Sequence, residues 1–248
     1  MNKSFTCNNQ LTNIYKSANP KSEVVSQILF GEKFYVTKKN KLFYEGFSVY
    51  DHYKGYVLKK HFIKTELSKN SRIILKKSFL YTAPDNNKKT KKYLLFNSLV
   101  SIIDQKNNFI KINKYWIKKN SINKTIIKSN NFLKKIFFFL KTKYLWGGNS
   151  ILGIDCSGLV QELMKSINKK CPRDSKDQLK FFKKNVSLNN IKRGDLLFWK
   201  GHVAIALNKK KLIHAYGPKK KVIIMSITNV INILSKKNLP LVAIKRPL

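Results

Sequence analysis

The sequence predicts an α+β protein in which two small β-barrels precede a domain of helices packed on an antiparallel sheet. Short β-rich runs fill about the first 66 residues, a weaker copy of those runs follows, and helical spacing gives way to strand patterns after residue 129. A chain of 248 residues with 43% hydrophobic and 12% aromatic content can bury cores of this kind. We therefore expect domains at residues 1–66, 67–128 and 129–248.

The first expected barrel consists of short strands broken by turns. Four runs of four to eight residues are enriched in β-branched and aromatic side chains, which is the length and composition of barrel strands. These runs are residues 24–30, 33–37, 43–50 and 54–57.

The second expected barrel repeats the order of segments of the first. Phe79–Pro84 parallels Asn13–Pro20, Leu94–Ile102 parallels the run from Ile28 to Val36, and residues 108–117 parallel the last two strands. A repeat of roughly 55 residues indicates a duplicated barrel.

The C-terminal part changes to helical spacing. Residues 131–140 are apolar enough for a buried helix, and a stripe of apolar side chains predicts a second helix over Ser157–Ile167. Ser175 and Gln178 have the spacing of a capping box, which predicts a third helix that opens at Ser175. Five strands are then expected, at residues 196–200, 202–208, 211–216, 221–227 and 241–246.

The charge of the chain is strongly positive. Lys and Arg number 51 against 12 Asp and Glu, so the formal net charge is +39, yet only four of the 51 are Arg. Arg suits bidentate recognition of phosphate and bases, whereas the Lys residues here are spread along the whole chain. We interpret the excess as compositional bias and expect no stable nucleic-acid partner, with a nucleic-acid footprint as the alternative.

No run of residues has the length and apolarity of a membrane span, and the first ten residues lack the apolar stretch of a signal peptide. Three cysteines, Cys7, Cys156 and Cys171, cannot form a disulfide framework and lack the short spacing of a zinc site. We therefore expect a cytoplasmic protein with no membrane partner, no metal and no cofactor.

The segment most specific to function is a glycine-rich loop that leads into a helix at Cys156. Unpaired N–H groups and the positive dipole end at a helix start favour the thiolate, which is the nucleophilic form. The alternative is that Cys156 is a small buried residue of the core.

A thiol nucleophile needs a base that can return its proton to a leaving amine, and histidine suits both steps. His202 and His214 fall on consecutive expected strands and share a face if the turn between the strands has an odd number of residues. Ala204 and Ala206 fall on that face too, where small side chains would let the helix with the thiol come close. Each histidine alone reads as structural, and so do His52 and His61, but His202 and His214 combined with Cys156 favour catalysis.

With these residues the C-terminal part resembles the NlpC/p60 family, papain-like cysteine peptidases that cut bacterial cell-wall peptides. The pattern is an aromatic Y-x-W-G-G segment at Tyr144–Gly148, D-C-S-G-L-V at Asp155–Val160, a G-H-V strand start at residues 201–203 and the second histidine, His214. A P-R-x-S-x-x-Q segment at residues 172–178 matches as well. More weakly, the whole chain resembles the subgroup with two bacterial SH3-like domains, the γ-D-glutamyl-L-diamino-acid endopeptidases.

The resemblance implies a role for each matching residue. Cys156 would be the nucleophile, His202 the base and His214 the third catalytic residue, and the Tyr144 hydroxyl would form an oxyanion hole with the backbone N–H of Cys156. The implied substrate-binding residues are Asp155, Ser157 and Ser175, together with Glu23 and Tyr53 (or Tyr56) from the first barrel, which would help to bind the amino group of an N-terminal L-alanine. Asp155 and Ser175 have an alternative reading as plain helix caps.

The implied function is a cytoplasmic cysteine peptidase that cleaves γ-D-glutamyl bonds to a diamino acid in short murein peptides with a free N-terminal L-alanine, as in peptidoglycan recycling. Two alternatives stay open. One is a catalytically weak SH3-like protein that binds acidic ligands or nucleic acid, and the other is an amidase or acyltransferase that acts on another amide.

Overall fold

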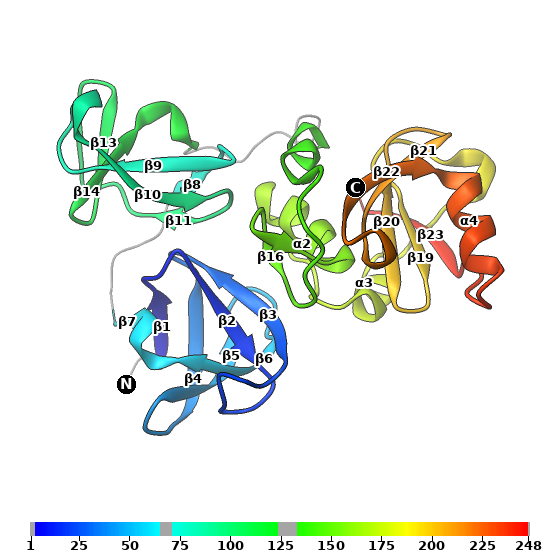
Figure 1. Ribbon diagram of the computed structural model, residues 1–248, viewed down its shortest axis with the longest axis horizontal. Coiled ribbons are helices and arrows are strands. Elements are labelled where there is room, and N and C mark those ends of the chain that lie inside the picture. The colour runs from blue at the N-terminus through cyan, green and yellow to red at the C-terminus, as the bar shows by residue number, and fades with distance from the viewer. Residues whose placement is uncertain (1–2, 65–70, 124–132, 248) are drawn as a thin grey trace. The chain divides into compact units, whose positions relative to one another are not determined.

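The computed structural model describes residues 3–64, 71–123 and 133–247 (Figure 1). The chain divides into an N-terminal unit, Met1–Ser129 with Ser166–Asn168, and a C-terminal unit, Asn130–Lys165 with Lys169–Leu248. Within the described residues, no helix combines the length and the apolarity that crossing a bilayer requires.

The first part of the N-terminal unit is an antiparallel sheet of seven short strands in the order β3-β2-β6-β5-β4-β1-β7. Its apolar centre holds Ile14, Phe34, Val57 and also Cys7, which is fully buried. The elements are β1 (Ser4–Cys7), β2 (Leu11–Tyr15), β3 (Val24–Leu29), β4 (Lys33–Lys39), β5 (Phe43–Ser48), β6 (Lys54–Leu58), the 3₁₀ turn η1 (Lys59–His61) and β7 (Phe62–Ile63).

The second part of the N-terminal unit repeats this topology. The strand order β10-β9-β14-β13-β12 corresponds to β3-β2-β6-β5-β4, and a separate sheet β11-β8-β15 corresponds to β4-β1-β7, so that one long strand of the first part is divided between β11 and β12. The elements are β8 (Ser71–Ile73), β9 (Lys77–Tyr81), η2 (Asn86–Lys88), β10 (Lys89–Leu95), β11 (Leu99–Val100), β12 (Asp104–Lys106), β13 (Phe109–Ile112), β14 (Tyr115–Lys118), η3 (Lys119–Ser121) and β15 (Ile122–Asn123).

The C-terminal unit places its first helices before a six-stranded antiparallel sheet of order β18-β23-β19-β20-β21-β22 (Figure 1). The elements before the main strands are η4 (Leu133–Phe139), β16 (Asn149–Ser150), β17 (Gly153–Ile154), α2 (Cys156–Ser166), α3 (Ser175–Phe181), β18 (Lys184–Asn185) and η5 (Leu188–Asn190). The rest are β19 (Leu196–Trp199), β20 (His202–Ala206), β21 (Lys211–Tyr216), η6 (Gly217–Lys219), β22 (Lys221–Ser226), α4 (Ile227–Ser235) and β23 (Ala243–Arg246).

The first two expected helices of this unit differ in outcome. The helix expected over Ser157–Ile167 is present as α2. The run at 131–140 forms the 3₁₀ helix η4 instead of an α-helix, with residues 131 and 132 outside the described residues. Ile136 and Phe139 are the buried members of η4, and their spacing of three residues matches the period of a 3₁₀ helix.

The helix α4 was not predicted: Ile227 was expected to end the strand at residues 221–227, and no element was expected over residues 228–240. Ser226 caps it by accepting a hydrogen bond from the N–H of Asn229 at 3.4 Å. Its buried residues Ile227, Val230 and Leu234 pack in one cluster with Ala204 and Ala206 of the sheet. The small alanines therefore make room for α4, and among the described residues this cluster includes no side chain of α2.

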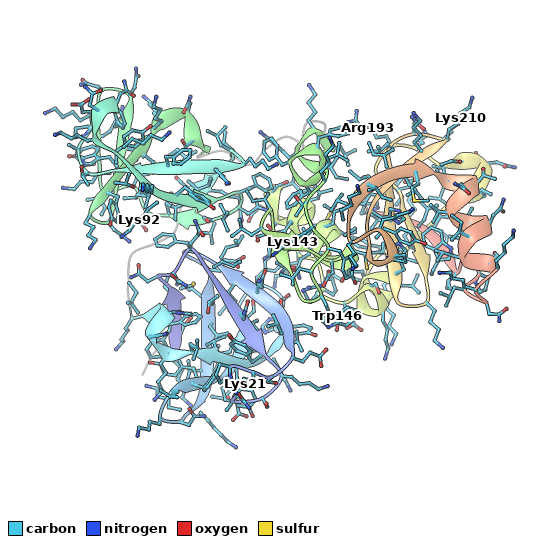
Figure 2. The ribbon with its side chains drawn as sticks, viewed as in Figure 1. Lys21, Lys92, Lys143, Trp146, Arg193 and Lys210 are labelled. Carbon is cyan, nitrogen blue, oxygen red and sulfur yellow. The ribbon has the colours of Figure 1, made fainter. Side chains whose placement is uncertain are left out.

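Positive side chains are distributed over both units. Figure 2 labels Lys21, Lys92, Lys143, Arg193 and Lys210, which lie on separate loops and strands.

Candidate active site

The loop before α2 places Cys156 at the first residue of the helix. The hairpin of β16 and β17 ends at Ile154, Asp155 follows, and the Oδ1 atom of Asp155 accepts the N–H of Gly158 at 2.7 Å. Asp155 is thus the side-chain cap of the helix that carries the thiol. A Cβ at Gly158 would lie 2.4 Å from the carbonyl oxygen of Gly148, so only glycine allows this close contact between helix and loop.

Arg173 holds the carboxylate of Asp155 in its capping position. Its guanidinium forms a bidentate pair with Asp155, with Nη1 2.9 Å from Oδ1 and Nη2 2.5 Å from Oδ2, and both side chains are buried. The Oδ2 atom also accepts the N–H of Gly147 at 2.9 Å, and Oδ1 accepts the hydroxyl of Ser157 at 3.3 Å. Five donors saturate the carboxylate, which favours the capping role of Asp155 over the binding of a substrate ammonium.

His202 and His214 lie side by side on one face of the sheet. Strand β20 pairs with β21 so that Ile205 faces Ile213, which puts the even-numbered residues of both strands on the same face. The Nε2 atom of His202 is 2.9 Å from Nδ1 of His214, within hydrogen-bonding distance. The structure thus brings together the two histidines that the spacing singled out.

The sulfur of Cys156 lies at the start of β20. It receives hydrogen bonds from the backbone N–H groups of Val203 and Ser157, and Val203 directly follows His202. The thiol therefore lies against the backbone of β20 at the residue that follows His202.

The environment of the thiol raises its pKa, contrary to the expectation from the helix dipole. Burial is the main cause and the charge of Asp155 adds to it, and together they raise the pKa of Cys156 to about 12. Burial also lowers the pKa of His202 to about 4. A dipole contribution of roughly 0.3–1 kcal/mol is too small to offset the hydration that the sulfur loses on burial. The resting site consequently holds a neutral thiol and a neutral imidazole.

Alkylation measures this protonation state. With Cys7 and Cys171 replaced by alanine, we expect iodoacetamide to react with Cys156 slowly at pH 7 and steadily faster up to pH 9, because the thiolate is scarce below its raised pKa. A fast rate that stays constant from pH 6 to pH 9 would show a preformed thiolate–imidazolium pair and contradict the neutral resting site.

Tyr144 lies in the same part of the unit. Its backbone N–H donates to the carbonyl of Lys220 at 2.9 Å, and its ring borders Gly217. The pKa of Tyr144 is raised to about 12, mainly by burial and to a smaller extent by the nearby Cys156 and Asp155. Its hydroxyl therefore keeps its proton at neutral pH and can donate a hydrogen bond.

The remaining expected substrate-binding residues fall in two places. Ser157 is buried, and its hydroxyl bonds Asp155 and also accepts from Arg173 at 3.0 Å. Glu23 and Tyr53 belong to the N-terminal unit, where exposed Glu23 pairs with Lys16 at 3.1 Å and the N–H of Tyr53 donates to Asp51. The geometry of the C-terminal unit thus leaves their roles as predictions.

Ser175 is the first residue of α3, and Asp174 occupies the N-cap position, so the expected capping box is wrong. The side-chain amide of Gln178 instead donates to the carbonyls of Ser157 and Pro172, both at 2.9 Å. In this way Gln178 ties α3 to the first turn of α2.

The sequence reading gave no role to Arg173, Gln161 or Met225. Arg173 could have been found from its rarity, since a chain that uses Lys for most positive charges keeps Arg where a planar, bidentate donor is needed. Gln161 accepts from Asn149 at 2.8 Å and donates to the carbonyl of Cys171 at 3.0 Å, which links α2 to β16 and to the loop at Cys171.

Comparison with protein families supplies a second line of observation. Residues 141–237 match the NlpC/P60 family, a range that includes Cys156, His202 and His214. The chain carries an NlpC/P60 domain. Residues 14–62 match the bacterial dipeptidyl-peptidase SH3 domain, so the first barrel is an SH3 domain of that type.

Named relatives of the chain include the gamma-D-glutamyl-L-lysine dipeptidyl-peptidase of Bacillus subtilis, 39% identical over 102 residues that make up 38% of this chain and 34% of the relative. Dipeptidyl-peptidase 6 of Lysinibacillus sphaericus is 36% identical over 85 residues, 34% of this chain and 31% of the relative. The chain matches about a third of the length of these relatives. Among solved structures, an NlpC/P60 family protein from Bacillus cereus has a TM-score of 0.84 at 17% identity over 99% of both chains, which shows a shared fold.

Among the residues that the structure describes, no three His, Cys, Asp or Glu side chains gather as metal ligands would.

Proposed function

We propose that the chain is a cysteine peptidase that cleaves the γ-D-glutamyl bond to a diamino acid in short murein peptides with a free N-terminal L-alanine. The observation that carries the proposal is a buried thiol at the start of α2 that lies against the backbone of Val203, directly after His202, whose Nε2 is 2.9 Å from Nδ1 of His214 on β21. Named relatives that act on γ-D-glutamyl-L-lysine support the substrate class.

The reaction begins with neutral groups. Cys156 attacks the γ-carbonyl carbon of D-glutamate while His202 takes the thiol proton on Nδ1, since its Nε2 is bonded to His214. The C–N bond breaks when His202 gives that proton to the departing amine of the diamino acid. Water, deprotonated by His202, then hydrolyses the thioester and restores the thiol.

The negative oxygen of the tetrahedral intermediate needs donors that are fixed in advance. The Tyr144 hydroxyl, which stays protonated, and the backbone N–H of Cys156 are the donors in this proposal. One such donor typically changes kcat by about 10²–10³-fold.

Selection for a free amino terminus is the second part of the proposal. In this proposal Glu23 and Tyr53 bind the substrate ammonium, because an ammonium needs a carboxylate partner and Asp155 is already saturated by Arg173 and backbone donors. A site of this kind excludes murein polymer, in which the alanine nitrogen is an amide. The activity then fits the recycling of released peptides in the cytoplasm.

The second part of the N-terminal unit is, in this proposal, a second SH3-like domain. Its strand order repeats that of the SH3 domain before it, and duplication accounts for both. This completes the architecture of two SH3-like domains before a peptidase.

Hydrolysis of L-Ala-γ-D-Glu-L-Lys and its N-acetylated form tests the proposal by mass spectrometry of the products. We expect release of lysine from the free peptide, with kcat/KM at least about a hundredfold above that of the acetylated peptide. The Glu23→Gln variant should lose most of that difference, whereas Asp104→Asn, which removes another exposed carboxylate of the same unit, should keep it. If neither peptide is cleaved, the proposed peptidase activity is contradicted. If both peptides are cleaved equally well, the proposed recognition of the ammonium is contradicted.

A further inference from the structure

The two ring nitrogens of His214 have different partners. Nδ1 is 2.9 Å from Nε2 of His202, and Nε2 is 3.3 Å from the thioether sulfur of Met225. Both contacts are within hydrogen-bonding range, the second one because sulfur is a larger acceptor atom. The ring of His214 is therefore held at both ends.

These partners determine where the proton of His214 lies. His214 is fully buried, and burial together with the neighbouring His202 lowers its pKa to about 3, so the ring is neutral and carries one N–H. A neutral imidazole donates from one nitrogen and accepts at the other, and a thioether can only accept. The hydrogen consequently belongs on Nε2, directed at Met225, and Nδ1 is left as an acceptor.

We infer that Met225 is a positioning residue that determines which ring nitrogens of His214 and His202 carry hydrogen. With Nδ1 of His214 accepting, His202 must carry its own hydrogen on Nε2, and its Nδ1 is then the unprotonated nitrogen. In the opposite order His202 would direct an N–H at Cys156 and could not serve as its base. The catalytic meaning of this inference rests on the proposed function, whereas the location of the proton does not.

The fold supports this role by strand register. Met225 lies on β22 opposite Leu212, and His214 lies opposite Ile223, so Met225 and His214 are diagonal neighbours across the pair. Tyr216 stacks on the ring of His214 with centroids 4.7 Å apart and an angle of 10° between the planes. Tyr216 thus fixes the plane of the imidazole, and Met225 fixes which edge carries hydrogen.

The tautomer of His214 and its two hydrogen bonds persist through the reaction. When His202 accepts the thiol proton on Nδ1, its Nε2–H continues to donate to Nδ1 of His214, and Nε2–H of His214 continues to donate to Met225. No hydrogen moves along the chain of groups, and the imidazolium is stabilised by an acceptor that already points at it.

Nitrogen-15 NMR of the histidine rings in the full chain measures the tautomers directly. We expect wild-type His214 to show hydrogen on Nε2 alone, and Met225→Leu, which removes the acceptor at similar volume, to show a mixture of both tautomers. Met164→Leu is the matched control, since Met164 is buried in α2, and should keep the wild-type tautomer. Hydrogen on Nδ1 in the wild type, or an unchanged ratio in Met225→Leu, would overturn the inference.

Kinetics separate this inference from the proposed function. We expect Met225→Leu to lower kcat for L-Ala-γ-D-Glu-L-Lys by roughly two- to tenfold with little change in KM, the effect of one hydrogen bond of ordinary strength. Met164→Leu should leave kcat unchanged, and an equal loss in both variants would contradict a positioning role. If the wild type cleaves no peptide, the proposed function fails while the tautomer measurement still decides where Met225 places the proton.

Discussion

Replacement of Cys156 by alanine is expected to lower kcat for L-Ala-γ-D-Glu-L-Lys by at least about 10⁴-fold, because no other group at the site can form the thioester. The sulfur is buried at the start of α2, but its removal deletes one atom and leaves the Asp155 cap and the Arg173 pair intact. The melting temperature of the variant should therefore stay close to that of the wild type. Steady-state hydrolysis and thermal unfolding of the full chain measure the two quantities.

Cys171→Ala is the matched control for this variant. Cys171 is as deeply buried and its thiol donates to the carbonyl of Pro172 at 3.5 Å, so its loss tests burial without the nucleophile. We expect nearly normal turnover. Turnover that survives in Cys156→Ala, or is lost equally in Cys171→Ala, is incompatible with the proposed nucleophile.

Replacement of Arg173 by alanine should give the largest loss of stability. It leaves the carboxylate of Asp155 buried without its bidentate partner, a change of about 3–5 kcal/mol in the free energy of unfolding. Because Asp155 caps α2, the loss should concentrate in the C-terminal unit. Hydrogen exchange read by mass spectrometry should show much faster exchange in peptides from α2 and little change in peptides from β2 to β6.

Arg193→Ala is the control, because Arg193 is exposed and the same charge is removed from the same unit. It should change the free energy of unfolding by less than about 0.5 kcal/mol. Equal exchange of α2 in the two variants would mean that the buried pair contributes nothing beyond its charge.

Local sequence patterns predicted many of the strands and helices of the fold. Strands such as β5 and β21 are short runs that end at turns, and α2 has a long helical stripe, so each was predicted close to its observed position. The helix α4 was not predicted because Ile227, Val230 and Leu234 follow a strand directly, and an apolar run next to a strand resembles its continuation. The formation of α4 depends on packing against Ala204 and Ala206, which are far from α4 in the sequence.

The candidate site divides in the same way. Cys156, His202 and His214 could be predicted as candidates because nucleophile, base and strand spacing are local properties, and the structure places the two histidine nitrogens 2.9 Å apart. The pKa of Cys156 was predicted with the wrong sign, because the helix start is visible in the sequence and the burial of the sulfur is not. Arg173 and Met225 act across distant segments, and only the folded chain shows their partners.

The most direct test of the central claim is to trap the acyl site with a substrate-derived electrophile. L-Ala-γ-D-Glu with a chloromethyl ketone in place of the scissile amide should alkylate the full chain once, and peptide mapping should place the label on Cys156. His202→Asn should label far more slowly, because the thiol then has no base to take its proton. Labelling of Cys7 or Cys171 at the same rate, or labelling of Cys156 that is unaffected by loss of His202, would contradict a thiol and histidine acting as one catalytic unit.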